Sequence, residues 1–428
     1  MKRLFLSVFV CLFVIDLLPI VCPAQTEELV VGNTFGVGAR SMGMGGASLG
    51  LADDFTALYW NPAGLAQIQQ FELFASFSQN TALTDSYFTS SETIGTSRSQ
   101  VRPNSIGLVY PFYTQQGGFS IAFGYNRAQN FDFQSAIQGV DPSSGNVFSG
   151  LYLNETNINS GGIGIWSFGG SVYISKNFLI GGSVDFWDGH SRNELDATAT
   201  DTLNVDSELT RFRFDDEIDR EYSGVSGRVG ILANFTDVVS WGVTFIAPTE
   251  LGVDELWREY TVALFDDGEE LTEPESGVTT YQIERPYEIG TGIALKLLDK
   301  QLILAGDIQF TDWRQTRYDP KHKPAEDIAN NHFEEYYSTT IQVRLGIEYQ
   351  IPMIDSYVRA GYFRDTIPFT ETEIDNDRDY LTVGVGKTFE DSVKLDVAYM
   401  WGNWQQYRND VTTQRNSHRV FVSCSYRY

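Results

Sequence analysis

The chain carries at residues 38–66 the stretch GARSMGMGGASLGLADDFTALYWNPAGLA, which decides its fold. The closely spaced glycines let this backbone approach other surfaces, because they lack a Cβ atom. Asp53 or Asp54 is placed to cap a short helix that ends near Trp60, and Asn61 to cap another with Pro62 at its first position. The segment therefore suits packing inside a larger structure, with a flexible surface linker as the alternative. A phosphate-binding loop is disfavoured, since the run contains no Gly-Lys-Ser/Thr.

An export signal precedes this segment. Basic residues at the start are followed by an apolar run from Leu4 to Val21, and small residues end it near Ala24. This order predicts a signal peptide over residues 1–24. No second apolar run is long enough for a transmembrane helix. After cleavage only Cys424 remains, so an intramolecular disulfide is excluded.

The charge of the chain limits its partners and cofactors. The net charge of −26 argues against nucleic-acid binding, which requires basic surfaces. Most of the acidic excess lies in residues 191–220, 249–286 and 366–379. Within the last range, Asp375, Asp377 and Asp379 alternate as in a calcium loop, but Tyr380 stands where that loop needs glycine. We therefore expect no metal site and no cofactor.

Strand-like alternation dominates the chain from Phe71 to Tyr428. Apolar and small or polar residues alternate over segments of about ten residues, which is typical of transmembrane β-barrels and also compatible with a β-sandwich. Clear examples are residues 119–126, 228–235 and 393–402.

The lengths of the connections favour the barrel over the sandwich. Short turns are expected at 112–117, 175–177, 236–238, 298–300, 351–355 and 389–391. Long loops are expected at 80–102, 128–160, 191–220, 249–286, 314–337, 366–379 and 405–415. Long and short connections alternate strictly, as periplasmic turns and external loops do in outer-membrane barrels. Thirteen connections predict an all-β fold with 14 antiparallel strands.

Three segments carry a resemblance to a known family. Residues 38–66 resemble the N-terminal plug of FadL/TodX-type outer-membrane channels, with its glycine-rich start, Asp-Asp pair and Asn-Pro-Ala turn. WGVTFIAP at 241–248 and RPYEIGTGIALKLLDKQLILAGDIQFTDW at 285–313 are similar to two strand regions of that family. The resemblance implies a plug over residues 25–69, inside the lumen of a transmembrane barrel over residues 70–428. It also implies the outer membrane of Gram-negative bacteria, and the alternating last strand looks like a signal for the barrel assembly machinery.

The resemblance further implies a channel for hydrophobic compounds, such as fatty acids or aromatic hydrocarbons, that communicates with outer-membrane lipid. Asn61, Pro62 and Ala63 match the plug turn beside the passage. By the same resemblance, Gly124, Tyr125 and Asn126 in the third strand are candidates for a lateral opening of the barrel. Inward-facing charges are expected to anchor the plug through Arg40, Asp53 and Asp54: Asp185, Arg228, Lys296, Asp307, Arg344, Glu348, Arg359, Lys394 and Asp396.

Two other functions are considered. An outer-membrane enzyme is not expected, because no catalytic set is found: His190 and Ser191 are adjacent, as are Ser417 and His418, so each pair points to opposite faces of a strand. A PorV-like accessory protein of a secretion system, which binds and shuttles secreted proteins, is the alternative. Its N-terminal signature also matches Gly38 to Ala66, and an acidic exterior suits protein contacts.

Overall fold

The computed structural model describes residues 36–88, 92–114, 117–142, 148–206, 208–318, 330–331, 333–368, 377–408 and 411–428. The expected signal peptide therefore lies outside the described residues, as does Asp375. Among the described residues, no helix is long and apolar enough to cross a membrane.

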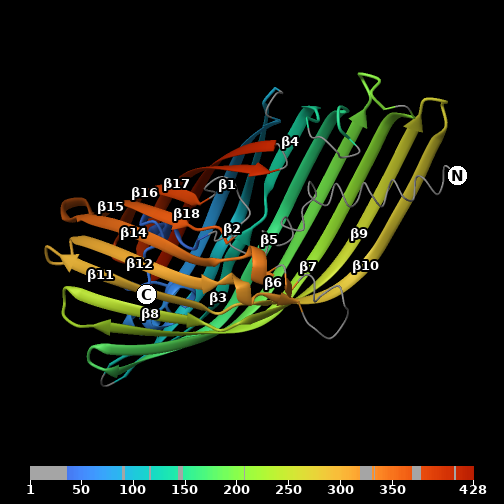
Figure 1. The fold of residues 1–428 in the computed structure, drawn as a ribbon. Coiled ribbons are helices and arrows are strands. Elements are labelled where there is room, and N and C mark those ends of the chain that lie inside the picture. Colours follow the sequence, from blue (N-terminus) through green and yellow to red (C-terminus); the bar gives the residue numbers. More distant parts are fainter. Residues whose placement is uncertain are drawn as a thin grey trace.

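The described chain forms one antiparallel sheet that closes on itself (Figure 1). Three short helical segments come first: α3 Ala39–Gly43, α4 Ala57–Trp60 and η1 Pro62–Gln67. The strands that follow are β1 Glu72–Phe88, β2 Ile94–Phe112, β3 Phe119–Asn130, β4 Phe133–Val140, β5 Tyr152–Ser175, β6 Phe178–Thr200, β7 Leu209–Asn234, β8 Val239–Ile246, β9 Thr249–Phe265, β10 Glu270–Arg285, β11 Glu288–Leu297, β12 Leu302–Asp312, β13 Arg317–Tyr318, β14 Thr339–Ile351, β15 Ser356–Asp365, β16 Arg378–Phe389, β17 Val393–Arg408 and β18 Val411–Arg427. Two further 3₁₀ turns are η2 Trp313–Gln315 and η3 Pro352–Ile354.

The expected barrel of 14 antiparallel strands is confirmed. Its order is β1-β2-β3-β5-β6-β7-β8-β11-β12-β14-β15-β16-β17-β18, and pairing of β18 with β1 closes it. β8 continues into β9, and β10 continues into β11, after a short break that contains Pro248 or Pro286, respectively. Proline cannot donate a ladder hydrogen bond, which explains why each long strand is divided there.

All six short turns connect neighbouring strands at one end of the barrel, as expected. The long loops differ from the expectation: most of residues 80–102, 191–220 and 249–286 are strand. The sequence analysis missed this because the outer face of these strands carries charged and polar side chains, while apolar residues such as Leu195, Phe212 and Phe214 lie only on the inner face. Cross-strand ion pairs such as Arg192–Glu217 and Arg258–Glu217 accompany the backbone ladder there.

The extended strands make the barrel lopsided. β5, β6 and β7 contain 24, 23 and 26 residues, whereas a membrane-spanning strand needs about ten. With β9 and β10 they rise well beyond the ends of β12, β14, β15 and β16 (Figure 1). We call this part, formed by residues 152–163, 188–206, 208–222 and 249–283, the tall wall.

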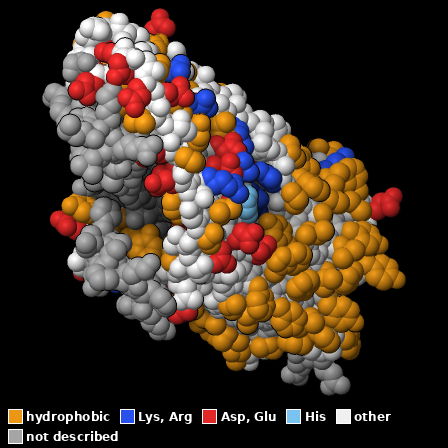
Figure 2. All heavy atoms as spheres, turned by 90° about the vertical axis from the view of Figure 1, so that its right-hand side faces the viewer, with side chains coloured by type: hydrophobic (Ala, Val, Ile, Leu, Met, Phe, Trp, Pro, Cys, Tyr) orange, Lys and Arg blue, Asp and Glu red, His pale blue; other side chains and the backbone are white. Residues whose placement is uncertain are grey.

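A hydrophobic band surrounds the outside of the barrel below the tall wall. Figure 2 shows it as a broad apolar surface, with acidic and basic side chains gathered directly beside it. Exposed members from around the barrel include Phe77, Ile106, Phe123, Phe168, Val184, Val229, Ile293, Ile308, Leu345, Val358, Val383, Val397 and Val422. Such a band is the surface that a barrel presents to lipid.

Candidate functional site

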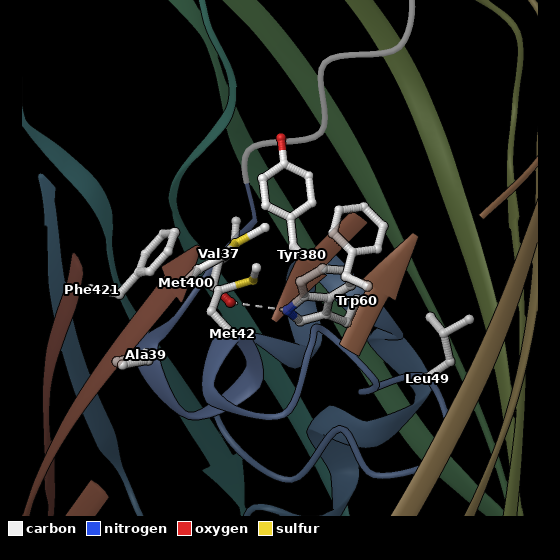
Figure 3. Close-up of a cluster of buried hydrophobic side chains, with 10 residues drawn as sticks. Val37, Ala39, Met42, Leu49, Trp60, Tyr380, Met400 and Phe421 are labelled. Carbon is white, nitrogen blue, oxygen red and sulfur yellow. Dashed lines mark hydrogen bonds between the residues drawn. The ribbon is translucent and has the colours of Figure 1, made fainter. Parts of the chain in front are cut away.

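Residues 36–68 lie inside the barrel and fill its lumen. Most of their side chains are buried. In Figure 3, Val37, Met42 and Trp60 of this segment pack against Tyr380 and Phe421 of the barrel. The Trp60 indole donates to the backbone oxygen of Val37 at 3.1 Å. This segment, which we call the plug, begins among the described residues at Gly36; the boundary expected between residues 69 and 70 stays a prediction, with β1 starting at Glu72.

The barrel makes room for the plug with inward-facing glycines. A Cβ atom at Gly230 would collide with the Asn61 side chain, and one at Gly242 with the backbone oxygen of Leu49. Further strand glycines that meet the plug in this way are Gly107, Gly124, Gly169, Gly181, Gly290, Gly346 and Gly361. At Gly181, Gly242, Gly346 and Gly361 the plug backbone itself lies against the strands, and at the other glycines a plug side chain fills the space.

The Asn-Pro-Ala turn is fixed to the wall by hydrogen bonds. The Asn61 oxygen accepts from the backbone nitrogen of Ala63 at 3.1 Å and caps η1. Its amide nitrogen donates to the backbone oxygens of Leu49 at 2.8 Å and of Ile231, on β7, at 3.1 Å. Ser171 of β5 donates to the backbone oxygen of Ala63. One buried side chain thus joins two parts of the plug to the barrel.

A buried charge network holds the other side of the plug. Arg40 donates to both carboxylate oxygens of Glu348, on β14, at 2.9 and 3.0 Å, and also pairs with Asp53. Arg359 of β15 pairs with Glu348 at 2.5 Å and with Asp396 at 2.8 Å. Buried charges require such partners.

Two further carboxylates, one in the plug and one on the barrel, accept hydrogen bonds from the plug. Asp54 lies 4.0 Å from Arg40 and accepts hydrogen bonds from the backbone and hydroxyl of Thr56, so it mainly orders the start of α4. Asp307 of β12 accepts from the backbone nitrogens of Ser48 and Leu49 at 2.6 and 2.8 Å.

A cavity of about 70 Å³ lies against the plug at Tyr59 and Trp60. The rest of its lining comes from nine strands, from Leu49 of the plug and from Trp313 of η2. The residues from the strands are Ala128, Gln129, Ile165, Trp187, Arg228, Thr244, Ile246, Arg285, Glu288, Gln309, Thr311, Gln342 and Arg344. Aromatic rings and guanidinium groups therefore share one enclosure.

The three arginines of the cavity lie over its rings. The guanidinium carbon of Arg228 is 4.9 Å from the ring centre of Tyr59, and that of Arg344 is 5.2 Å from Trp60. Arg285 lies 4.9 Å from Trp187 and 5.6 Å from Trp313.

Among the described residues that line the cavity, one side chain is acidic. Glu288 pairs with Arg285 at 3.4 Å. Arg344 donates to the side-chain oxygens of Gln309 and Gln342 at 2.9 and 2.6 Å. The lining carries more positive than negative charge, which favours an anionic group in the cavity.

The third strand departs from regular pairing beside the cavity. β2 and β3 pair only from Ser105–Asn126 to Phe112–Phe119, and the pairing of β3 with β5 is irregular between Arg127 and Gln129. Gln129, next to this irregularity, lines the cavity.

The three residues expected at the lateral opening lie just before this point. Gly124 lies against Phe55 of the plug, Tyr125 packs against Trp166, and Asn126 is buried and accepts from Ser105 at 2.6 Å. The irregularity therefore begins one residue after the expected stretch.

The sequence analysis missed several of these features. It expected Arg228 and Arg344 to face the lumen, but not Arg285, Trp187 or Trp313. The glycine contacts had a usable signal, because Gly124 and Gly230 stand in the inward phase of two alternating segments. Among the described residues, no group of three or more His, Cys, Asp or Glu side chains could hold a metal ion.

Comparison with known families gives this fold a name. The profile of the outer membrane protein transport protein family (OMPP1/FadL/TodX) matches residues 30–423. The chain belongs to this family. The resemblance inferred from the three segments is thereby confirmed, as is the outer membrane as the location of the barrel. The family consists of transport proteins and not of enzymes.

Solved structures of the family share the fold. The toluene transporter TodX of P. putida superposes with a TM-score of 0.64 at 16% identity, over 92% of this chain and 99% of TodX. A FadL homologue of Pseudomonas aeruginosa gives 0.62 at 14% identity, over 93% and 99%. The toluene transporter TbuX of Ralstonia pickettii gives 0.60 at 18% identity, over 92% and 99%. A search of curated proteins found no match. These findings give no support to the secretion-shuttle alternative.

Proposed function

We propose that this protein is an outer-membrane channel for hydrophobic compounds that bear a carboxylate, such as long-chain fatty acids. The observation that carries the proposal is the cavity against the plug, where three arginines and a single glutamate stand among aromatic rings. The rings offer apolar surface to a hydrocarbon chain, and the excess of guanidinium groups offers hydrogen bonds to an anionic head group.

The charge of the cavity favours a fatty acid over a neutral hydrocarbon. TodX and TbuX are described as toluene transporters, and toluene can offer an arginine only the face of its ring, with no oxygen atom to accept a hydrogen bond. A neutral ligand would leave Arg228 and Arg344 less well solvated than before it entered, which costs free energy. A carboxylate would replace the displaced water.

The proposed passage runs past the plug and leaves sideways. The inner face of the tall wall leads down to the cavity through an apolar cluster that includes Trp187, Tyr222 and Ile283. From the cavity, a ligand would leave between β2 and β3, beside Gly124, Tyr125 and Asn126. In this proposal Asn61, Pro62 and Ala63, together with Arg40, Asp53 and Asp54, set how far the plug moves during passage.

The test is uptake of radiolabelled oleate by Gram-negative cells that lack their own importer, with surface exposure of the protein verified. We expect saturable uptake, and we expect Asn61→Ala to weaken it, because the change removes the link from the plug to Ile231. Arg344→Gln should weaken oleate binding by about tenfold or more, as expected for a lost charged hydrogen bond. Exposed Arg314, which pairs with Asp312 outside the cavity, provides the control variant Arg314→Gln.

Two outcomes would contradict the proposal. Correctly assembled protein that takes up toluene but not oleate would show that the substrate is a neutral hydrocarbon. Deletion of Gly36 to Ala66 should abolish selective uptake, so an assembled deletion variant with undiminished oleate uptake would refute the role of the plug.

A further inference from the structure

The backbone ladder between β2 and β3 ends abruptly halfway up the barrel. The last paired residues are Ser105 and Asn126. Two residues of β2 beyond Ser105 disturb the pairing. Pro103 has no N–H to donate. Asn104 is an extra residue in the pairing with β1, because Ser105 faces Ser76 and Pro103 faces Phe77, the next residue of β1. A bulge on β2 thus stands across from the irregularity on β3, and in the part of the chain that the structure describes the regular ladder between the two strands ends at Ser105 and Asn126.

Among the described residues above this point, an ion pair bridges the two strands next to the end of their ladder, and Thr96 of β2 donates to the backbone oxygen of Gln134, on β4, farther along. Arg102 of β2 donates to both carboxylate oxygens of Asp132, at 2.9 Å from Nη2 and 3.3 Å from Nε. Asp132 lies between β3 and β4 and also accepts from the backbone nitrogen of Gly161, on β5, at 3.2 Å. A side chain of β2 is therefore tied to β5 across the unpaired stretch.

The two partners of this ion pair differ in exposure. The Asp132 side chain is almost wholly buried, whereas that of Arg102 is 35% exposed. Arg102 can therefore turn into water when the pair separates, while Asp132 keeps its contact with Gly161. Such a pair can open and close without leaving both charges stranded in the interior.

The plug is connected to the same place. The amide of Asn104, fully buried, donates to the backbone oxygen of Gly36 at 2.9 Å and accepts from the backbone nitrogen of Gly38 at 3.1 Å. Movement of the start of the plug would break both hydrogen bonds and free the bulge of β2 beside the ion pair.

We propose that the Arg102–Asp132 ion pair is a latch across the lateral opening, and that Asn104 couples it to the plug. The inference rests on the proposed function, because it assigns the opening step to particular residues of that passage. When the plug shifts, Asn104 releases β2, the latch separates, and the strands part between Ser105 and Asp132.

A reversible crosslink tests the latch. In a Cys424→Ser background, which removes the exposed native cysteine, Arg102 and Asp132 are both replaced by cysteine and joined by a bis-methanethiosulfonate reagent. We expect cells with the crosslinked protein to take up no more oleate than cells that lack the protein. A reductant, which cleaves the crosslink, should restore uptake. Uptake that stays undiminished after complete crosslinking, verified by mass, would overturn the latch.

A matched control uses the same chemistry where neighbouring strands are paired. Arg364 of β15 donates to Asp377 at 2.7 and 3.0 Å, next to the regular ladder between β15 and β16. Crosslinked Arg364→Cys/Asp377→Cys protein should take up oleate as before. Loss of uptake there too would show a general effect of the reagent and overturn the assignment to the latch.

Binding separates this inference from the proposed function. Purified crosslinked protein should still bind oleate, because the cavity is left intact. Wild-type protein that binds no oleate would refute the proposed substrate, whereas normal binding with normal uptake in the crosslinked protein refutes the latch alone.

A single variant gives an independent result: Arg102→Gln weakens the pair and should speed uptake about two- to fivefold, in line with a partly exposed ion pair. A rate equal to or below the wild type would contradict the latch.

Discussion

Two glutamates of this barrel each lie between two arginines, in very different surroundings. Glu348, inside the plug-filled barrel, pairs with Arg40 of the plug and Arg359 of β15, and its side chain is 3% exposed. Glu217, on the outer face of the tall wall, pairs with Arg192 and Arg258, and its side chain is 30% exposed.

The difference teaches what holds each region together. In the plug-filled barrel the charges face inward and are satisfied by another segment of the chain, so the wall depends on the plug. On the outer face of the tall wall the charges of neighbouring strands satisfy one another and remain in contact with water. Ion pairs in water contribute little, so backbone pairing and packing must hold the tall wall together.

The largest expected effect concerns these two glutamates. Glu348→Gln removes the carboxylate and leaves Arg40 and Arg359 buried with fewer partners, which should lower the free energy of unfolding by about 3–5 kcal/mol. Glu217→Gln should cost less than about 1 kcal/mol, because its partners are exposed. Denaturant unfolding of both variants in lipid vesicles gives the comparison. Equal losses would show that the buried network does not set the stability of the barrel.

Much of the barrel could be predicted from the sequence, because lipid imposes a strong pattern. Each membrane strand must show apolar residues outward and small or polar residues inward, and this gave the strand number and all six short turns. Above the membrane the same strands continue with water on their outer face. Their partners, such as Glu217 for Arg192, come from another strand, so no local pattern distinguishes them from loops.

The candidate site was predicted only in part, for a similar reason. The Asn-Pro-Ala turn and Arg40 stand in one short motif, and their position was visible at once. The cavity combines Trp187, Arg285 and Trp313 from three distant strands, so it requires the fold. Pro103 was the overlooked local signal, since a proline within an alternating segment marks a place where strand pairing fails.

A smaller effect on stability is expected when glycines on the two faces of β7, a strand of the plug-filled barrel, are replaced by valine. Gly230 of β7 faces the plug, whereas Gly227 faces outward and a Cβ there would meet only the backbone oxygen of Ser183, at 3.7 Å. Gly230→Val should push the Asn61 turn away and cost about 1–3 kcal/mol, as overpacking does. Gly227→Val should be tolerated, because valine suits a strand that faces lipid.

Limited proteolysis measures this difference through the plug. We expect cleavage within residues 36–68 to speed up in the Gly230→Val protein and to stay slow in Gly227→Val. Equal protection of the plug in both variants would mean that it can move away from Gly230 without loss, and the close contact would then have no structural role.

The smallest expected effect lies in the tall wall and depends on pH. Asp216 is buried on β7, and its direct neighbour across the ladder is Glu259 of β9. Burial first, and then the charge of Glu259, raise the pKa of Asp216 to about 7. An unfolded chain would hold this proton only below about pH 4. Because the folded wall binds the proton more tightly, its free energy of unfolding should fall as the pH rises from about 4 to about 7.

Hydrogen exchange in residues 212–222, corrected for the intrinsic pH dependence, measures this change. We expect the segment to open more readily at pH 8 than at pH 6, and Asp216→Asn to remove most of the difference. Residues 341–349, in the plug-filled barrel, provide the internal reference, because they belong to β14 and lie outside the tall wall. If Asp216→Asn leaves the pH dependence of the segment unchanged, burial of Asp216 has no effect on stability. Its carboxylate would then be as well solvated as the exposed ion pairs of Glu217. The contrast between the two regions would then rest on the plug alone.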